Sequence, residues 1–207
     1  KNGIKEISFE RKDSTYIKKK YKAKADFSKD NVIVCLANLI PYKGHIHLIN
    51  SLNIMNRSFK KWKLIIIGEG EDKYKSKLAD LIKKFNLQRK IFFTGIQIYP
   101  ERFLNSAKLG ILLSDHEGSS NAMVEYMNHS LPVITTDSGN IREIIKNKLN
   151  GYIVKQTDYT EIAYLIQKIL TEKLKSREMG KKNKKIVKQI FNYAEMITRY
   201  KKIYDKT

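Results

Sequence analysis

The 207-residue chain has a single cysteine and no long hydrophobic run. A lone cysteine excludes a disulfide framework and is consistent with a cytoplasmic protein. Cys35 lies within an apolar segment, so we expect it to be a small core residue and not a reactive thiol. The longest apolar runs, at 32–37 and 64–67, are far too short to span a bilayer. Because hydrophobic residues make up 42% of the composition, the chain can still build a substantial core.

Motifs of several large enzyme classes are also missing. The sequence has neither the G-x-G-x-x-G fingerprint nor the loop G-x-x-x-x-G-K-[S/T], which argues against dinucleotide-dependent dehydrogenases and P-loop ATPases. It contains no nucleophile elbow and no Ser–His–Asp order. His45 and His47 lack a matching cluster of carboxylates or cysteines, so we expect no metal site. Residues 1–4 provide neither an initiator methionine nor a signal-peptide core, and we expect a segment of a longer protein.

The formal net charge is +20, and it is concentrated at the two ends of the chain. Residues 1–24 hold nine basic and three acidic side chains, and residues 171–207 hold twelve and four, which leaves +6 for the middle. Three explanations of the basic ends of the chain are open: a lysine-rich bias on solvated helix faces, attraction to an anionic membrane surface, or binding to nucleic acid. Since no aromatic-interleaved basic strand or zinc-finger spacing is present, we expect no nucleic-acid partner.

Short apolar segments alternate with amphipathic ones, which is typical of a parallel sheet covered by helices. We expect strands at about 32–37, 63–67, 90–94, 109–113, 132–136 and 151–154. Helices are expected between them at about 44–56, 73–85, 100–107, 120–129 and 141–146. Asp72 is expected to cap the second of these helices. The pattern predicts an α/β fold with a Rossmann-like, doubly wound sheet in a single domain, 1–207.

The last third of the chain is helical. We expect helices at about 158–171, 176–190 and 193–204. The last of them carries apolar side chains at helical spacing, at Met196, Tyr200, Ile203 and Tyr204. We interpret these as a docking face rather than as a cofactor pocket.

Every segment with chemically useful side chains follows directly after an expected strand. These segments are 43–44, 68–70, 94–97, 117–125 and 135–139. Ligands of doubly wound sheets bind at the carboxyl ends of the strands, so we expect the five segments to converge at one edge. A lysine beside a glycine at a helix start is suited to a phosphate. The glycines at 68–70 are equally explained by a tight turn.

The segment 115–125 is the most informative of the five. Glu117 and Glu125 stand eight residues apart around a Gly-Ser-Ser-Asn loop, within which a helix is expected to begin. The free N–H groups and positive dipole end of a helix N-terminus bind anions, while carboxylates accept hydrogen bonds from sugar hydroxyls. The pattern therefore indicates a nucleotide-sugar site. As an alternative, each glutamate is a surface residue, and the one near the helix N-terminus complements the helix dipole. We interpret His116 as a turn residue or as a partner of Glu117.

In this order, the segments resemble the C-terminal, donor-binding domain of retaining glycosyltransferases of the GT-B fold, the group 1 class. The resemblance covers almost the whole chain. The matching motifs are 2–4 at the start of the domain, 37–44 in the first phosphate loop, 66–70, 93–95, the Glu-x7-Glu motif within 114–125, 131–137 and 150–154.

The resemblance implies a role for each matched residue. Glu125 would accept the ribose hydroxyls, Glu117 would bind hydroxyls of the donor sugar, and Lys43 would stabilise the negative charge that develops on the leaving group. Main-chain groups near Ile96 and Gln97 would contact the base. The other implied donor-binding positions are Asn38, Gly44, Gly95, Gly118, Ser119, Ser120, Asn121 and Ala122. No metal or other cofactor is implied, because the lysine and the helix dipole replace it.

One position departs from the family pattern. Members of the class usually carry an arginine five residues before the lysine, as a second diphosphate contact, and this chain has Asn38 there. An asparagine donates hydrogen bonds but does not offset charge. Either another cation compensates, or the affinity for the donor is lower and Lys43 carries more of the binding.

The function implied is transfer of a hexose, with retention, from a nucleotide diphosphate sugar to a glycan or lipid-linked acceptor, in the biosynthesis of polysaccharide, lipopolysaccharide or glycolipid. A UDP-sugar is favoured by its frequency in the family. The acceptor would bind an N-terminal domain of the same enzyme, so we expect this chain alone to transfer sugar poorly. We also expect peripheral contact with an anionic membrane at its cytoplasmic face. A non-catalytic nucleotide-sugar binder, a sugar-nucleotide epimerase and a basic nucleic-acid-binding module remain as alternatives.

Overall fold

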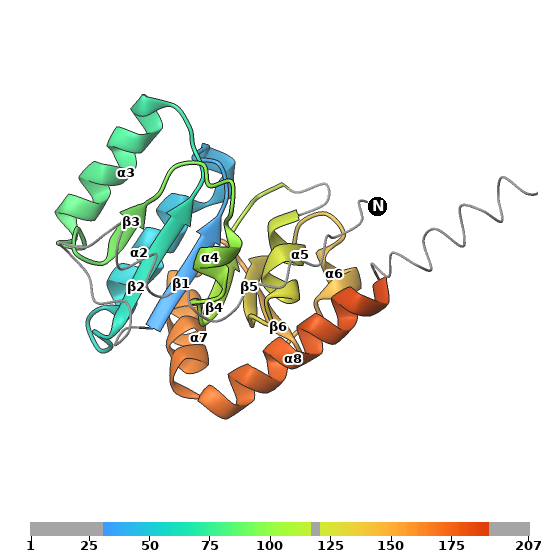
Figure 1. The fold of residues 1–207 in the computed structure, drawn as a ribbon. Helices are drawn as coiled ribbons and strands as arrows, with labels where there is room; N and C mark the ends of the chain where they lie inside the picture. Colours follow the sequence, from blue (N-terminus) through green and yellow to red (C-terminus); the bar gives the residue numbers. More distant parts are fainter. Residues whose placement is uncertain (1–30, 117–120, 191–207) are drawn as a thin grey trace, which may run out of the picture.

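The structure, a computed structural model, describes residues 31–116 and 121–190. Parallel strands form one sheet in the order β3-β2-β1-β4-β5-β6 (Figure 1). The strands are β1 (Asn31–Leu36), β2 (Trp62–Ile67), β3 (Ile91–Phe93), β4 (Leu109–Leu112), β5 (Val133–Thr136) and β6 (Gly151–Val154). The direction of winding reverses between β1 and β4, so the expected Rossmann-like, doubly wound α/β fold is confirmed.

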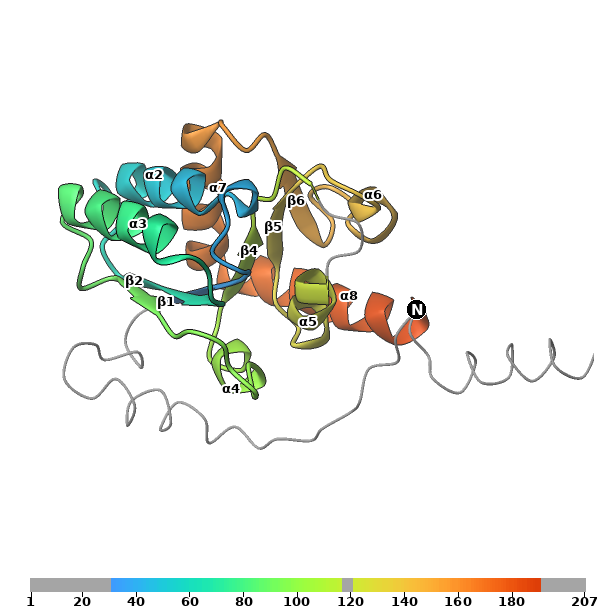
Figure 2. The same ribbon diagram turned by 90° about the horizontal axis from the view of Figure 1, so that it is seen from above.

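Helices cover both faces of this sheet (Figure 2). One face is covered by α2 (His45–Met55), α3 (Asp72–Lys84) and α7 (Tyr159–Thr171). The other face is covered by α4 (Glu101–Leu104), α5 (Asn121–Asn128) and α8 (Lys173–Ile190). The short α6 (Ile141–Ile144) connects β5 to β6. Because the sheet is sandwiched, its central strands are apolar on both faces, as in β4, where all four residues are buried.

Cys35 lies in β1 and is 1% exposed, so it is the small core residue expected from the sequence. Burial raises the pKa of its thiol to about 12, although the charge of Lys43 partly opposes this shift. A thiol with so high a pKa holds its proton at neutral pH and is a poor nucleophile.

Two local expectations differ from the structure. Asp72 is the first residue of α3 and makes no capping hydrogen bond; its carboxylate instead lies 3.6 Å from Lys75 Nζ, one turn along the helix. The last described helix begins at Lys173 rather than near 176. A 3₁₀ turn, η2 (Pro41–Lys43), precedes α2 because Pro41 fixes a helical φ at its start. The expected helix at 193–204 lies outside the described residues.

A buried pair of asparagines attaches α8 to the rest of the domain. Asn183 Nδ2 donates to the carbonyls of Leu131, at 2.7 Å, and Asn150, at 2.8 Å. Asn150 Nδ2 in turn donates to Asn183 Oδ1 at 2.8 Å. Both asparagines are 0% exposed. Because these polar groups satisfy one another away from water, they fix the position of α8 against the turns before β5 and β6.

We expect Asn183→Leu to lower the free energy of unfolding by about 2–4 kcal/mol, since it leaves buried carbonyls without donors. Urea denaturation of the two proteins would measure this as a lower midpoint at an unchanged slope. Gln189→Leu makes the same amide-to-leucine change at an exposed position of α8 and should stay within about 0.5 kcal/mol of the wild type. Equal midpoints for the Asn183 variant and the wild type would contradict a structural role for the pair.

Candidate functional site

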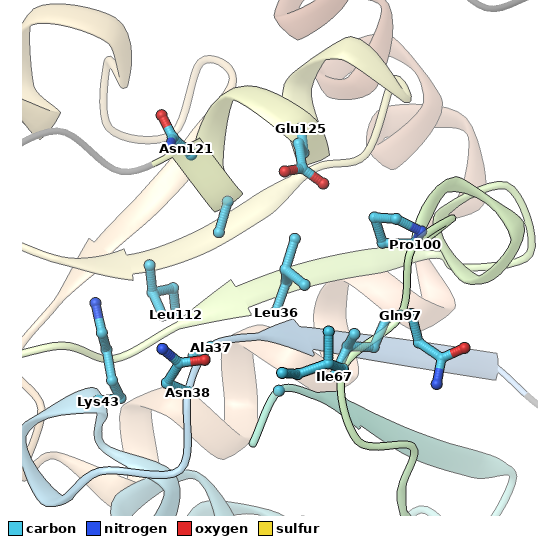
Figure 3. Close-up of a pocket in the computed structure, with 13 residues that line it drawn as sticks. Leu36, Ala37, Asn38, Lys43, Ile67, Gln97, Pro100, Leu112, Asn121 and Glu125 are labelled. Atoms are coloured by element: carbon cyan, nitrogen blue, oxygen red, sulfur yellow. The ribbon is translucent and has the colours of Figure 1, made fainter. Parts of the chain in front are cut away.

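A cavity of about 470 Å³ opens at the carboxyl ends of β1, β2 and β4. It adjoins the point between β1 and β4 where the strand order reverses, which is where sheets of this kind bind ligands. The residues that line it, drawn in Figure 3, are Leu36, Ala37, Asn38, Lys43, Ile67, Gly68, Ile96, Gln97, Pro100, Leu112, Asn121, Ala122 and Glu125.

Four of the five segments expected to converge contribute to this cavity. The segment after β1 provides Asn38 and Lys43, and the next two segments provide Gly68, Ile96 and Gln97. From the Glu-x7-Glu segment come Asn121, Ala122 and Glu125. The described residues do not include the first part of the Glu-x7-Glu segment, namely Glu117, Gly118, Ser119 and Ser120.

The fifth expected segment, 135–139, lies at the same edge of the sheet, as expected, but does not line the cavity. Thr136 is buried at the end of β5, where its hydroxyl donates to the carbonyl of Ser114 at 2.5 Å. Asp137 forms an ion pair with Arg142, at 2.7 Å, outside the cavity. The side chains of Thr136 and Asp137 are therefore engaged with the chain itself, whereas the buried hydroxyl of Ser138 has no hydrogen-bond partner among the described residues.

Glycines let the loops after β1, β2 and β4 meet through their main chains. Gly44 has φ +74°, and a Cβ placed on it would lie 1.9 Å from the main-chain oxygen of Leu113. A Cβ on Gly68 would lie 2.1 Å from the oxygen of Ala37. Gly68 also donates its N–H to the carbonyl of Gly95, at 3.1 Å. Gly44 and Gly95, which were expected among the donor-binding residues, do not line the cavity but join the loops that carry its lining.

Lys43 and Asn38 lie on one side of the cavity, and Asn121 and Glu125 lie on the other (Figure 3). The Lys43 ammonium is 5.2 Å from the ring centroid of Tyr42. The neighbouring His45 is fully buried. Burial first, and then the charge of Lys43, lower the pKa of its imidazole to about 4, although the main-chain groups of Ala37 and Ile40 act to raise that pKa. His45 is therefore neutral at neutral pH.

Glu125 is half-buried at the edge of the cavity, opposite Lys43. Burial, and then the negative charge of Glu101, raise the pKa of its carboxyl group. Glu101 is the first residue of α4, and its Oε1 is buried without a hydrogen-bond donor among the described residues. The Glu125 carboxyl group, with a second carboxyl group nearby, is suited to ligand groups that donate hydrogen bonds, such as hydroxyls.

Tyr126 holds α5 in place over the strands, a role that sequence reasoning missed. Its hydroxyl accepts a hydrogen bond from the N–H of Leu36, at 2.5 Å, and donates to the carbonyl of Ile111, at 3.4 Å. The ring crosses β4 at Gly110, where an added Cβ would lie 2.4 Å from a ring carbon. A glycine inside a strand is the sequence signal for such a close approach. The contact fixes Asn121 and Glu125, on the same helix, against the end of β1.

Within 31–116 and 121–190, no group of three or more His, Cys, Asp or Glu side chains is placed to hold a metal ion. A site that works without a metal remains a prediction. In the same ranges, no helix is long and apolar enough to cross a membrane.

Solved structures confirm the fold. The Anabaena protein HepE, in complex with UDP-glucose, superimposes with a TM-score of 0.84 at 19% identity, covering 96% of this chain and 54% of that one. A glycosyltransferase from Rickettsia africae superimposes with a TM-score of 0.84 at 17% identity, covering 96% and 52%. These matches support the expected fold class, one Rossmann-like half of a GT-B fold.

Sequence comparison shows the family. An uncharacterized glycosyltransferase of Methanocaldococcus jannaschii is 36% identical over 134 residues, which are 64% of this chain and 32% of that protein. The poly(ribitol-phosphate) alpha-N-acetylglucosaminyltransferase of Staphylococcus aureus is 23% identical over 186 residues, 89% of this chain and 37% of that enzyme. The chain thus spans about a third of the length of these relatives. Because residues 17–186 match the family model of glycosyl transferases group 1, the chain belongs to that family of glycosyltransferases.

Proposed function

We propose that this chain is the donor-binding part of an enzyme that transfers a hexose, with retention, from a nucleotide diphosphate sugar to a glycan or lipid-linked acceptor. The observation that carries the proposal is the meeting of Lys43 with the first residues of α5 and Glu125 around one cavity at the switch point. A cation and a helix N-terminus suit a diphosphate, and a carboxylate suits vicinal hydroxyls. The UDP-glucose complex of HepE, a protein of the same fold, supports this assignment.

Each lining group has a place in the proposed complex. Glu125 accepts hydrogen bonds from the ribose hydroxyls, and the main-chain N–H groups of Asn121 and Ala122 bind the diphosphate. Main-chain groups of Ile96 and Gln97 contact the base; Ile96 is 72% exposed and lies at the rim. In the unbound protein Gln97 Nε2 donates to the carbonyl of Thr94, at 2.7 Å. Glu117, Gly118, Ser119 and Ser120 retain their expected roles at the donor sugar.

Lys43 and the positive end of α5 provide the proposed electrostatic catalysis. Negative charge builds on the β-phosphate as the bond to the sugar breaks, and a cation held close by stabilises that transition state more than the ground state. Asn38 adds hydrogen bonds but no charge at the position where the family usually has arginine. Since His45 is neutral, Lys43 supplies the charge of this loop. On this proposal, no metal is needed.

The acceptor is proposed to bind a separate N-terminal domain of the full-length enzyme, so that the chain by itself binds donor and transfers sugar poorly. Contact with an anionic membrane is proposed to bring a lipid-linked acceptor within reach, at the cytoplasmic face. Helix α8 supports this idea, because it carries eight basic side chains and one acidic one. Such a helix face is attracted to anionic lipid headgroups.

We expect calorimetric titration of this chain, without metal, to show saturable binding of one of UDP, GDP and ADP. Glu125→Ala should weaken that binding by about tenfold or more, because charged hydrogen bonds are worth roughly 1.5–3 kcal/mol. Glu178→Ala removes an exposed carboxylate from α8 and should leave the dissociation constant unchanged. An equal loss in both variants, or none in either, would sink the role of Glu125.

We expect nucleotide binding to strengthen as the pH rises through the pKa of Glu125, since the ionised carboxylate is the better acceptor. Folding raises the pKa of Glu125, so the folded protein favours the protonated carboxyl group. The resulting contribution to the free energy of unfolding is complete below the unfolded-state pKa of 4.5 and is lost as the pH rises through the folded-state pKa. Glu101→Gln removes the neighbouring charge. It should move to lower pH both the rise in nucleotide affinity and the loss of folding stability. Dissociation constants of the nucleotide across the acidic range measure this, with Glu178→Gln as the control. An unmoved transition in Glu101→Gln would contradict the coupling of the two carboxyl groups.

In the full-length enzyme, Lys43→Ala should raise the barrier by about 2–4 kcal/mol, because it removes the cation that offsets charge on the leaving group. This corresponds to a fall in kcat/KM of roughly 30- to 1000-fold. Lys83→Ala, at an exposed position of α3, is the matched control. A fall of less than threefold for Lys43→Ala would exclude the assignment, and so would an equal effect of the control.

A further inference from the structure

A second cavity, of about 390 Å³, lies at the opposite edge of the sheet. It is bounded by the amino ends of β1, β4 and β5, the end of α4, the turn after α5 and the junction of α7 with α8. Figure 1 shows this edge at the bottom of the view, away from the carboxyl ends of the strands. The cavity is therefore separate from the proposed donor site.

Basic side chains from two distant parts of the chain meet at this cavity. Lys108 precedes β4, while Lys173 and Arg177 lie on the first two turns of α8, and the lining contains no acidic residue. In the described part of the chain, none of these three side chains makes an ion pair; the nearby Glu172 pairs with Lys175 instead, at 3.9 Å. Like charges gathered around one hollow repel one another, and an anion placed between them removes that cost.

The lining of the cavity is mixed, and several of its neutral polar groups already make hydrogen bonds within the chain. Leu104, Leu131 and Leu170 are buried there. Asn31 donates to the carbonyl of Lys61 at 2.9 Å, and Ser176 donates to that of Ile169 at 2.6 Å. A ligand is thus offered charged donors together with some apolar surface, which suits an anionic group attached to a less polar body.

His129 provides a titratable reporter inside the cavity. Its Nδ1 lies 2.9 Å from Asn105 Oδ1. Burial first, and then the charge of Lys184, lower the pKa of the His129 imidazole, so the ring is neutral at neutral pH. An anion bound beside it would stabilise the imidazolium form and raise that pKa.

We infer that this cavity is a second binding site, for a phosphate ester whose phosphate is held by Lys108, Lys173 and Arg177. The guanidinium of Arg177 is suited to two oxygens of one phosphate, and the lysines supply further charge. The rest of the molecule lies against the mixed lining of the cavity. The same chemistry is presented by a soluble phosphorylated metabolite and by the headgroup of a phospholipid, and the experiment separates these two sources.

The first test titrates the isotope-labelled chain with glycerol 3-phosphate, with glycerol as the uncharged control, and follows the histidine ring signals by NMR. We expect saturable binding, a rise in the pKa of His129 and little change at His47, which lies elsewhere. The double variant Lys173→Gln/Arg177→Gln should weaken binding by about tenfold or more. The control Lys181→Gln/Lys185→Gln makes the same change on exposed positions of α8 and should stay within about twofold.

Binding at the donor site is excluded in the same titration. Excess UDP should not reverse the change at His129, and Lys43→Ala should leave it intact. These two results hold whether or not the chain binds nucleotide, so the inference fails or stands independently of the proposed function. Reversal by UDP, or equal weakening in the two double variants, would overturn it.

The second test compares sedimentation with vesicles of phosphatidylglycerol and of phosphatidylcholine. A loss of binding to the anionic vesicles in the cavity variant, but not in the control variant, assigns the site to a lipid headgroup. Equal vesicle binding by both variants, together with saturable glycerol 3-phosphate binding, assigns it to a soluble phosphate ester. If neither probe distinguishes the cavity variant from the control, the basic residues act only as a solvated surface and the inference is wrong.

Discussion

The candidate donor site depends on main-chain contacts that leave no room for a Cβ atom. Gly44 lies against the carbonyl of Leu113, and Gly68 lies against that of Ala37. Through these contacts the main chains of the loops after β1, β2 and β4 pack directly against one another. Side chains that follow three different strands therefore surround one cavity. The interactions of Lys43, Asn38 and Glu125 with a ligand all presuppose this arrangement, because a shift of a few tenths of an ångström changes which groups can reach it.

The electrostatics of the site follow from what is buried around it. His45 lies beneath the loop with a pKa of about 4, and the Cys35 thiol has a pKa of about 12, so both are uncharged at neutral pH. The protein therefore keeps these two buried groups beneath the loop neutral, next to the side chain of Lys43. On the other side, burial and the negative charge of Glu101 raise the pKa of the Glu125 carboxyl group. The cavity thus has a cationic side and a side whose charge responds to its occupant.

The fold was largely predictable from the sequence because each strand is a short apolar run with a polar segment after it. The order of the strands follows from parallel pairing and right-handed crossovers. The prediction placed 135–139 at the correct edge of the sheet, but nothing local tells whether polar side chains face a cavity or, as with Thr136 and Asp137, the chain itself. It also missed Glu101 and Tyr126, whose partners lie on other elements. Their effects come from tertiary packing, which periodicity and spacing do not encode.

Helix α8 is mechanically linked to the donor site although it lies far from it in sequence. Its Gly180 packs so tightly on the turn after α5 that a Cβ would lie 1.9 Å from the Ser130 carbonyl, and Asn183 bonds to Leu131 beside it. Because α5 carries Asn121 and Glu125, the packing of α8 helps to set the position of one wall of the donor cavity. Substitutions along α8 that disturb Gly180 or Asn183 therefore act on the donor site without touching a ligand.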